Sequence, residues 1–190
     1  LNAVEKLRAE GFTETRYQVA HGQFVHPDDV ARFGELGVSA DISPFIWVPG
    51  PIVEAIREVL PRERADRMQP NRAILDAGAV VAGGSDWPVS PPPNAWEGIH
   101  GLVTRQDPSG QYPGTLWPEQ AITLEEAIAA FTIGGAEAMG LAGETGSLEA
   151  GKSADFVLLD RDPFLHPADE LVRTTVTETW FAGRRVYARD

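Results

Sequence analysis

The sequence contains no cysteine, which excludes disulfide bonds and thiolate metal ligands. A transition metal could therefore be held only by histidine and carboxylate side chains. Positive charge is scarce, because 16 lysines and arginines stand against 28 aspartates and glutamates, and the formal net charge is −12. The acidic residues are spread along the chain, and this balance argues against nucleic acid as a partner.

Long apolar runs are absent as well. No run approaches the roughly 20 apolar residues that cross a bilayer, and the first residues, LNAVE, lack the basic and apolar regions of a secretion signal. We therefore expect no membrane partner and a cytoplasmic location. Because the chain starts without methionine, inside an amphipathic helical pattern, we also expect the native amino terminus to lie further upstream.

The 190-residue chain is 43% hydrophobic, which suffices for a buried core in one or two domains. Up to about residue 140, helical patterns alternate with short apolar strands, as in a parallel sheet whose strands are joined by helices. After about residue 143, strands and turns replace the helical pattern. We expect helices over residues 1–10, 27–37, 51–60, 71–78, 94–103, 123–131 and 136–140, and strands over residues 15–21, 38–44, 80–85, 153–160, 176–181 and 184–187, with a weaker strand near 67–68.

Several helix starts carry capping signals. Thr123 and Glu126 have the spacing of a capping box. Asn71 and His26 each stand where a helix begins, and we expect both to cap. These signals fix helix ends and favour no particular function.

The strand that starts at Val80 ends in the carboxylate of Asp86, and a proline-rich loop follows it. In a parallel α/β barrel, reactive groups lie at the carboxyl ends of the strands, so this aspartate is a candidate catalytic residue. Aspartate also caps turns often, and the local pattern alone leaves both interpretations open.

Five segments decide between them. They are GSDWPV at residues 84–89, TR at 104–105, LEEA at 124–127, the run from GSLEAGKSADF at 146–156 to Asp160, and the hairpin TWFAGRRVY at 179–187. Together they resemble the carboxyl-terminal part of the metal-dependent amidohydrolase superfamily. Within it, the sequence is most similar to the branch of N-substituted formamide deformylase-like hydrolases. The GSLEAGKSADF segment is highly specific, whereas a lone GSD would not be.

The resemblance implies an α/β fold, with residues 1–142 as the second half of a TIM-type (β/α)₈ barrel and residues 143–190 as part of a small β-sandwich. It places the fifth-strand metal ligand on His21 and the eighth-strand ligand on Asp86. The implied cofactor is a divalent metal, zinc first and iron as the alternative, which lowers the pKa of bound water to roughly 7. Asp86 would also be the general base in hydrolysis of a carbon–nitrogen bond in a small amide-like substrate.

The sequence departs from this family in three respects. The family's first-strand His-x-His pair is absent, because the four histidines stand at 21, 26, 100 and 166. The segment 41–47, taken as the sixth strand, offers no second histidine. Only some 140 residues precede the strand-rich tail, against about 250 for a complete barrel. We therefore expect a truncated protein with weak metal binding, no turnover by itself, and self-association through exposed sheet edges.

The remaining candidates each have a structural alternative. Trp47 and Trp87 could contact substrate, although core packing explains them equally well. For His100, packing is favoured over substrate contact. Arg105 could anchor an anionic group, although a structural ion pair is the simpler expectation. His166 we expect in an exposed loop. Two other functions stay open, a deaminase of a nucleobase-like ring and a non-catalytic half-barrel that serves in assembly.

Overall fold

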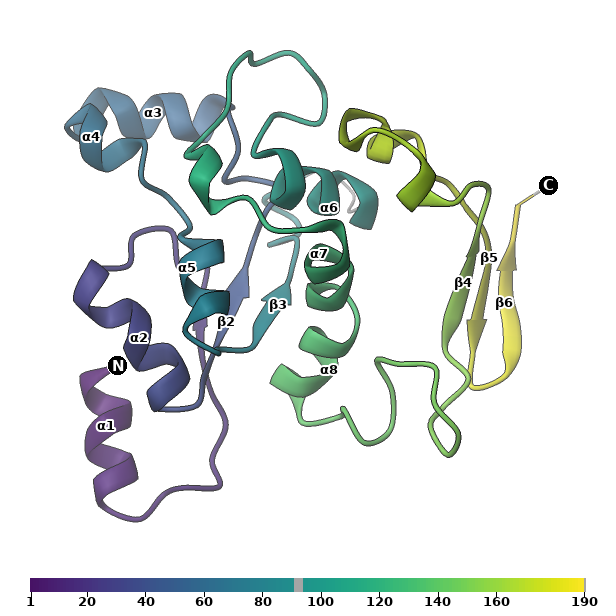
Figure 1. Cartoon of the computed structure of the whole chain (residues 1–190), viewed down its shortest axis with the longest axis horizontal. Coiled ribbons are helices and arrows are strands. Elements are labelled where there is room, and N and C mark those ends of the chain that lie inside the picture. The colour runs from purple at the N-terminus through teal and green to yellow at the C-terminus, as the bar shows by residue number, and fades with distance from the viewer. Residues whose placement is uncertain (91–93, 190) are drawn as a thin grey trace.

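The computed structural model describes residues 1–90 and 94–189, so the proline run at 91–93 lies outside the described residues. It contains two three-stranded sheets with helices between and around them (Figure 1). None of the helices in the described ranges has the length and hydropathy needed to cross a membrane. In chain order the elements are α1 (Asn2–Ala9), β1 (Tyr17–Ala20), α2 (Pro27–Glu35), β2 (Val38–Ile42), α3 (Pro51–Val59), α4 (Arg62–Ala65), α5 (Asn71–Asp76), β3 (Val81–Gly83), α6 (Ala95–Thr104), η1 (Pro118–Gln120), α7 (Leu124–Ala130), α8 (Ile133–Met139), β4 (Phe156–Leu159), η2 (Pro163–Leu165), η3 (Ala168–Arg173), β5 (Val176–Phe181) and β6 (Arg184–Ala188).

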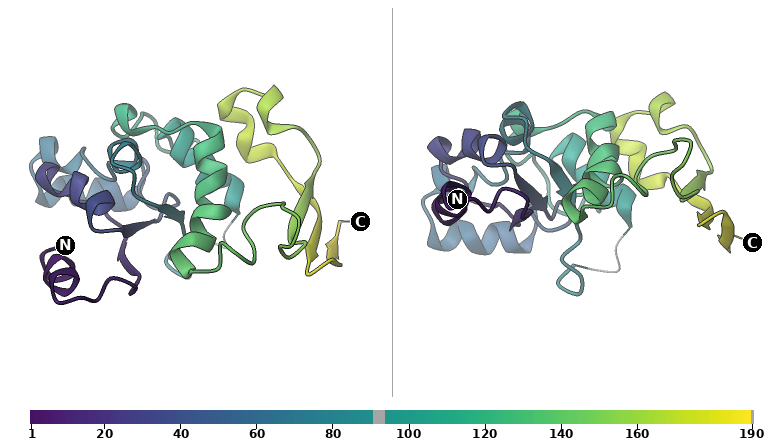
Figure 2. Two further views of the ribbon diagram at one scale, coloured as in Figure 1. Left: turned by 60° about the horizontal axis from the view of Figure 1, so that its bottom comes forward. Right: turned by 90° about the horizontal axis from the view of Figure 1, so that it is seen from below.

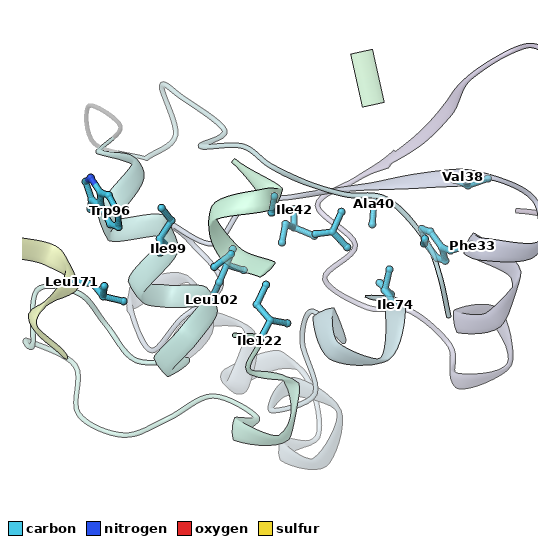
Figure 3. Close-up of a cluster of buried hydrophobic side chains, with 14 residues drawn as sticks. Phe33, Val38, Ala40, Ile42, Ile74, Trp96, Ile99, Leu102, Ile122 and Leu171 are labelled. Carbon is cyan, nitrogen blue, oxygen red and sulfur yellow. The ribbon is translucent and has the colours of Figure 1, made fainter. Parts of the chain in front are cut away.

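The first sheet has the order β1-β2-β3, and all its strands are parallel, as the alternation of helices and strands predicts. Along β2 the residues at positions 38, 40 and 42 are buried, because alternate side chains of a strand point to the same face. They join the main hydrophobic core with Phe33 of α2 and Ile74 of α5 (Figure 3). Helix α6 extends this core through Trp96 and Leu102.

One expectation about this part of the chain is wrong. The segment near 67–68 forms no strand; α4 ends just before it, and Gln69 takes a left-handed conformation with φ of 53°. In addition, β1 and β2 are neighbours and β2 and β3 are neighbours, with no fourth parallel strand in the described parts of the chain. If Asp86 follows the eighth strand of a barrel, counting back along the sheet makes β1 the sixth strand. On that count His21 would follow the sixth strand in place of the fifth.

The helix caps follow the sequence signals with one exception. At the start of α7, Thr123 and Glu126 form the reciprocal bonds of a capping box. The ring of His26 accepts a hydrogen bond from the amide of Asp28 at the start of α2. Asn71 does not cap α5: Pro70 holds that position, and the Asn71 side chain is fully buried inside the first turn.

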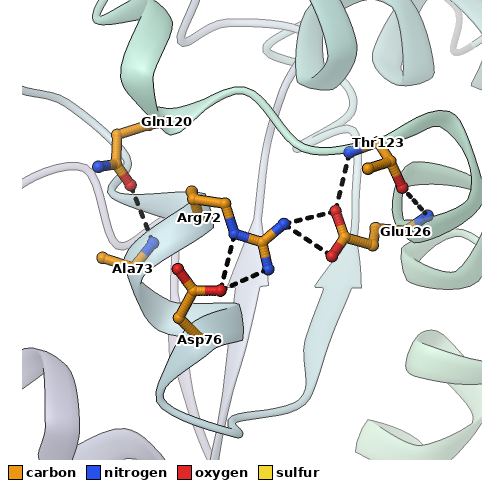
Figure 4. A network of polar contacts seen from close by, with 6 residues as sticks. All are labelled: Arg72, Ala73, Asp76, Gln120, Thr123 and Glu126. Carbon is orange, nitrogen blue, oxygen red and sulfur yellow. Dashed lines mark hydrogen bonds and ion pairs between the residues drawn. The ribbon is translucent and has the colours of Figure 1, made fainter.

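A polar network links α5 to the helices that follow α6 (Figure 4). The guanidinium of Arg72 donates to both carboxylate oxygens of Glu126, at 2.7 and 2.6 Å, and also to Asp76. The amide of Ala73 donates to the Gln120 side chain at 3.0 Å. The capping box of α7 therefore also joins two segments that are 54 residues apart.

The second sheet is antiparallel, with the order β4-β5-β6, and Figures 1 and 2 show it at the end of the molecule opposite α1. The expected hairpin between β5 and β6 is confirmed, and its turn residues Ala182 and Gly183 both have positive φ. Side chains on this sheet are only half-buried or exposed. The preceding helix η3 packs against α6 and contributes Leu171 to the main core.

Candidate metal site

Two side chains face each other at the carboxyl ends of β1 and β3. His21 directly follows β1, Asp86 lies three residues after β3, and both backbones are left-handed, with φ of 66° and 55°. The His21 Nε2 lies 3.8 Å from the Asp86 Oδ1, and the two side chains are 36% and 32% exposed. The sequence places the pair at one edge of a parallel sheet, and the geometry brings the two groups together as expected.

Ser43, which follows β2, sets the orientation of the His21 ring. Its hydroxyl oxygen lies 3.0 Å from the His21 Nδ1, and Ser43 is buried. When an imidazole binds a metal through Nε2, its proton sits on Nδ1, which then donates to a neighbouring acceptor. In that tautomer the Ser43 oxygen would be the acceptor, and this contact leaves Nε2 on the side of Asp86.

Gln69 supports the same loop from the segment before α5. Its side-chain amide donates to the His21 carbonyl oxygen at 3.1 Å, and its backbone amide donates to the Gln23 carbonyl oxygen at 3.0 Å. Gln69 is fully buried. The left-handed turn at His21 is therefore held by a neighbouring segment as well as by its own strand.

Asp41 on β2 is the third ionisable group in this area. Burial raises the pKa of its carboxyl group, the nearby His21 opposes that rise, and the charge of Asp86 adds to it. Gly84 makes room for it, because a Cβ at that position would lie 3.0 Å from the Asp41 Oδ1. The site therefore combines one imidazole with two carboxylates of unequal environment.

The donor set fits part of a divalent metal site. Imidazole nitrogen and carboxylate oxygen are ligands that zinc and iron accept. The separation of 3.8 Å between the donor atoms of His21 and Asp86 is too long for a hydrogen bond and short enough for one ion to contact both. Within residues 1–90 and 94–189, no group of three or more histidine or acidic side chains is arranged to hold a metal. The described residues thus offer two donors and leave the remaining positions of a coordination shell to other groups.

The two tryptophans proposed as substrate contacts differ in position. Trp47 is buried, and its ring meets the His21 ring edge-on with centroids 6.5 Å apart. It packs with Met68 and Leu116 and so forms a wall beside the histidine. Trp87, the residue after Asp86, is largely exposed. Both positions are compatible with substrate contact, and that role stays a prediction.

His100 and Arg105 lie inside the protein. His100 on α6 is buried, its Nδ1 lies 3.3 Å from the Thr104 hydroxyl, and burial lowers its pKa. Arg105 is 0% exposed and donates to the carbonyl oxygens of Leu116 and Met68 at 3.0 and 2.7 Å. Burial lowers the pKa of Arg105 to about 10. None of the carboxylates in the described segments forms an ion pair with it, so its partners are backbone carbonyls in place of the expected acid.

Ser43, Gln69 and Asp41 were not predicted from the sequence as site residues. The rule that selects Asp86, a polar residue at the carboxyl end of a buried strand, applies equally to Asp41 and Ser43 and could have found them. Gln69 gives no such signal, because its contact with His21 joins residues 48 positions apart. The remaining histidines lie at the surface: His26 caps α2, and His166 lies 3.7 Å from Glu170.

The chain is similar in sequence to known proteins. The amidohydrolase family matches residues 1–187. The chain is 31% identical over 195 residues to N-substituted formamide deformylase of Arthrobacter pascens, covering 100% of this chain and 34% of that protein. It is 30% identical over 181 residues to Protein LONG AFTER FAR-RED 3 of Arabidopsis thaliana, covering 94% of this chain and 30% of that protein.

Among solved structures, an adenosine deaminase from Xanthomonas campestris with bound zinc is similar in fold. It has a TM-score of 0.66 at 21% identity, over 96% of this chain and 39% of that chain. The chain thus spans about a third of the length of these two relatives. Because the family match extends over nearly every residue, the chain belongs to the amidohydrolase family.

Proposed function

We propose that this chain provides the carboxyl-terminal part of a metal-dependent hydrolase that cleaves a non-peptide carbon–nitrogen bond in a small amide-like molecule. The observation that carries the proposal is the approach of the His21 Nε2 to the Asp86 Oδ1, at 3.8 Å, at the carboxyl ends of two strands of one parallel sheet. The 31% identity with a formamide deformylase supports an amide-like substrate.

The proposed architecture follows from the order of the strands in the two sheets. Residues 1–142 would supply the last three strands of a (β/α)₈ barrel with their helices. Residues 143–190 would supply strands of a β-sandwich. The parallel order β1-β2-β3 supports the first part, and the antiparallel order β4-β5-β6 supports the second.

In this proposal His21 and Asp86 are the ligands of a divalent ion, zinc with iron as the alternative. When bound, such an ion polarises water and the substrate carbonyl. Asp86 takes the proton from the attacking water and returns it to the leaving nitrogen, which is the work of a general base and then a general acid. Ser43 keeps the His21 tautomer fixed, and Trp47 excludes water from one side of the ring.

Two donors hold a divalent ion weakly, because structural and catalytic zinc sites use at least three protein ligands. We therefore propose that the 190-residue chain by itself binds zinc weakly and shows no turnover. The free edges of the first sheet favour self-association, which analytical ultracentrifugation would detect as a mass above that of one chain.

Zinc titration by calorimetry tests the proposal, with His21→Ala and Asp86→Asn as the site variants and His166→Ala as the matched control. We expect weak zinc binding by the unmodified chain, loss of that binding in both site variants, and no change in the control. Circular dichroism verifies that each variant is folded.

Zinc binding that survives both site variants would overturn the assignment of the site. Tight stoichiometric zinc with measurable hydrolysis by the bare chain would overturn the proposal that it is incomplete. In an enzyme that carries the full ligand set, release of ammonia from a heteroaromatic ring would point to a deaminase, and release of an amine and an acid to an amide hydrolase.

A further inference from the structure

One cavity of this protein is not lined by the His21–Asp86 pair. A cavity of about 590 Å³ opens between the loop after β1 and the short helix α4, and this volume lies in the range of small-molecule sites. Figure 1 shows α2 and α4 one above the other on the same side of the molecule. Neither His21 nor Asp86 lines the cavity, whose walls are Phe24, Val25, His26, Pro27, Pro61, Glu63, Arg64, Arg67 and Trp117.

The walls of this cavity combine aromatic and cationic side chains. Phe24 and Trp117 supply two aromatic rings from segments that are more than 90 residues apart in sequence. The guanidinium of Arg64 lies 5.7 Å from the centre of the Phe24 ring. Such a stack holds an arginine flat beside an apolar surface and leaves its outer edge free to donate hydrogen bonds.

The cations of the cavity are poorly neutralised. Arg64 forms no ion pair with any carboxylate in the described parts of the chain, and Arg67 approaches only Glu63, at 3.9 Å. Both partners of that pair are mostly exposed, so the contact is weak. Among the described residues, Glu63 alone lines the cavity with an acidic side chain, in a protein whose formal net charge is −12.

We infer that this cavity binds a small aromatic carboxylate. The aromatic body fits between Phe24 and Trp117, and the carboxylate accepts hydrogen bonds from Arg64 and Arg67. A bidentate guanidinium–carboxylate contact gives both charge and geometric complementarity. This inference needs no metal and does not depend on the proposed hydrolase activity.

Calorimetric titration with 1-naphthoate tests the inference, with 1-naphthalenemethanol as the uncharged probe of similar shape. We expect 1-naphthoate to bind at millimolar concentration or below, and Arg64→Ala and Arg67→Ala each to weaken it about three- to fivefold. Arg62→Ala is the matched control, because Arg62 belongs to the same helix and does not line the cavity. It removes the same charge and leaves affinity unchanged.

Tryptophan fluorescence locates the bound probe. We expect 1-naphthoate to quench emission in the unmodified chain and this quenching to fall in Trp117→Phe. The inference is overturned if the uncharged probe binds as tightly as 1-naphthoate, if Arg62→Ala weakens binding as much as Arg64→Ala, or if 1-naphthoate does not bind. Failure here leaves the zinc titration unaffected, since the two sites share no side chain.

Discussion

The two sheets of this protein have the same number of strands and opposite environments. Sheet β1-β2-β3 is parallel and lies in the main core, where three alternate residues of β2 are buried. Sheet β4-β5-β6 is antiparallel, and every residue of β6 is exposed. The ionisable groups of the candidate metal site belong to the first sheet and its loops alone.

The difference shows how the fold positions chemistry. Buried strands fix the loops at their carboxyl ends, so His21 and Asp86 can keep left-handed backbones and still face each other. The second sheet depends on neighbours in sequence, such as the bond from the Trp180 ring nitrogen to Glu178. Its contacts lie within one stretch of the chain, as in the stacked rings of Phe156 and Trp180, whose centroids are 5.5 Å apart.

The largest expected difference in unfolding free energy is between removing a buried arginine, Arg105, and removing an exposed arginine of the second sheet. Arg105 is 0% exposed and donates to two backbone carbonyls, so Arg105→Ala leaves two buried acceptors without donors and opens a cavity. We expect a loss of about 4 kcal/mol in the free energy of unfolding. Urea denaturation measures it.

Arg185→Ala on β6 is the matched control, since the Arg185 side chain is 54% exposed and pairs only with Glu178. We expect a loss of about 0.5 kcal/mol there. If Arg105→Ala hardly changes the free energy of unfolding, then removal of the buried charge offsets the loss of its hydrogen bonds. The stability of the protein interior would then depend on other contacts.

The next contrast uses a valine from each sheet. Val38 on β2 is 1% exposed and Val186 on β6 is 60% exposed. Both substitutions to alanine lose the same strand preference, so the difference isolates burial. We expect Val38→Ala to cost about 2 kcal/mol and Val186→Ala about 0.5 kcal/mol or less. Equal losses of unfolding free energy in urea denaturation would show that Val186 is buried in solution.

The local parts of the fold were accessible from the sequence. The capping box at Thr123, the hairpin at residues 179–187 and the strand expected over residues 38–44 are short-range signals, and each is confirmed. The expected strand near 67–68 is wrong, because the left-handed turn at Gln69 is set by bonds to a loop more than 40 residues away.

The candidate site was accessible only in part for the same reason. His21 and Asp86 follow from a family motif, and their approach is confirmed. The roles of Ser43 and Asp41 depend on register between strands, because residue 41 pairs with 20 and 82 across the sheet. The partners of Arg105 are backbone carbonyls, and no side-chain pattern in the sequence encodes such a contact.

A smaller effect tests how the first sheet orients its histidine. Ser43→Ala removes the hydroxyl that lies 3.0 Å from the His21 Nδ1, which frees the ring to rotate and to change tautomer. We expect zinc affinity to fall about tenfold with little change in unfolding free energy. Calorimetric titration at fixed pH measures the affinity.

Ser153→Ala is the control from the second region, where the Ser153 hydroxyl donates to Asp155 at 2.8 Å. It removes a side-chain hydrogen bond of similar length and leaves zinc affinity unchanged. Ser43→Thr keeps the hydroxyl and restores much of the affinity. If Ser43→Ala binds zinc as tightly as the unmodified chain, the hydroxyl does not orient His21.

The smallest contrast is in acid stability. The hydrogen bonds from Arg72 lower the pKa of Glu126 below its ordinary value of 4.5, and the bond from the Trp180 ring lowers the pKa of Glu178 in the second sheet. A carboxylate with a lowered folded-state pKa contributes stability that is present above its unfolded pKa and is lost as the pH falls through the folded pKa. Glu126→Gln therefore lowers the free energy of unfolding at pH 7 by about 0.5 to 1 kcal/mol and flattens its decline below about pH 4.5.

Glu178→Gln changes that decline in the same direction and by less, because Glu178 bonds within its own hairpin while Glu126 joins α5 to α7. Urea denaturation at a series of pH values compares them, and a larger effect from Glu178 would show that the second sheet contributes to global stability as much as the first.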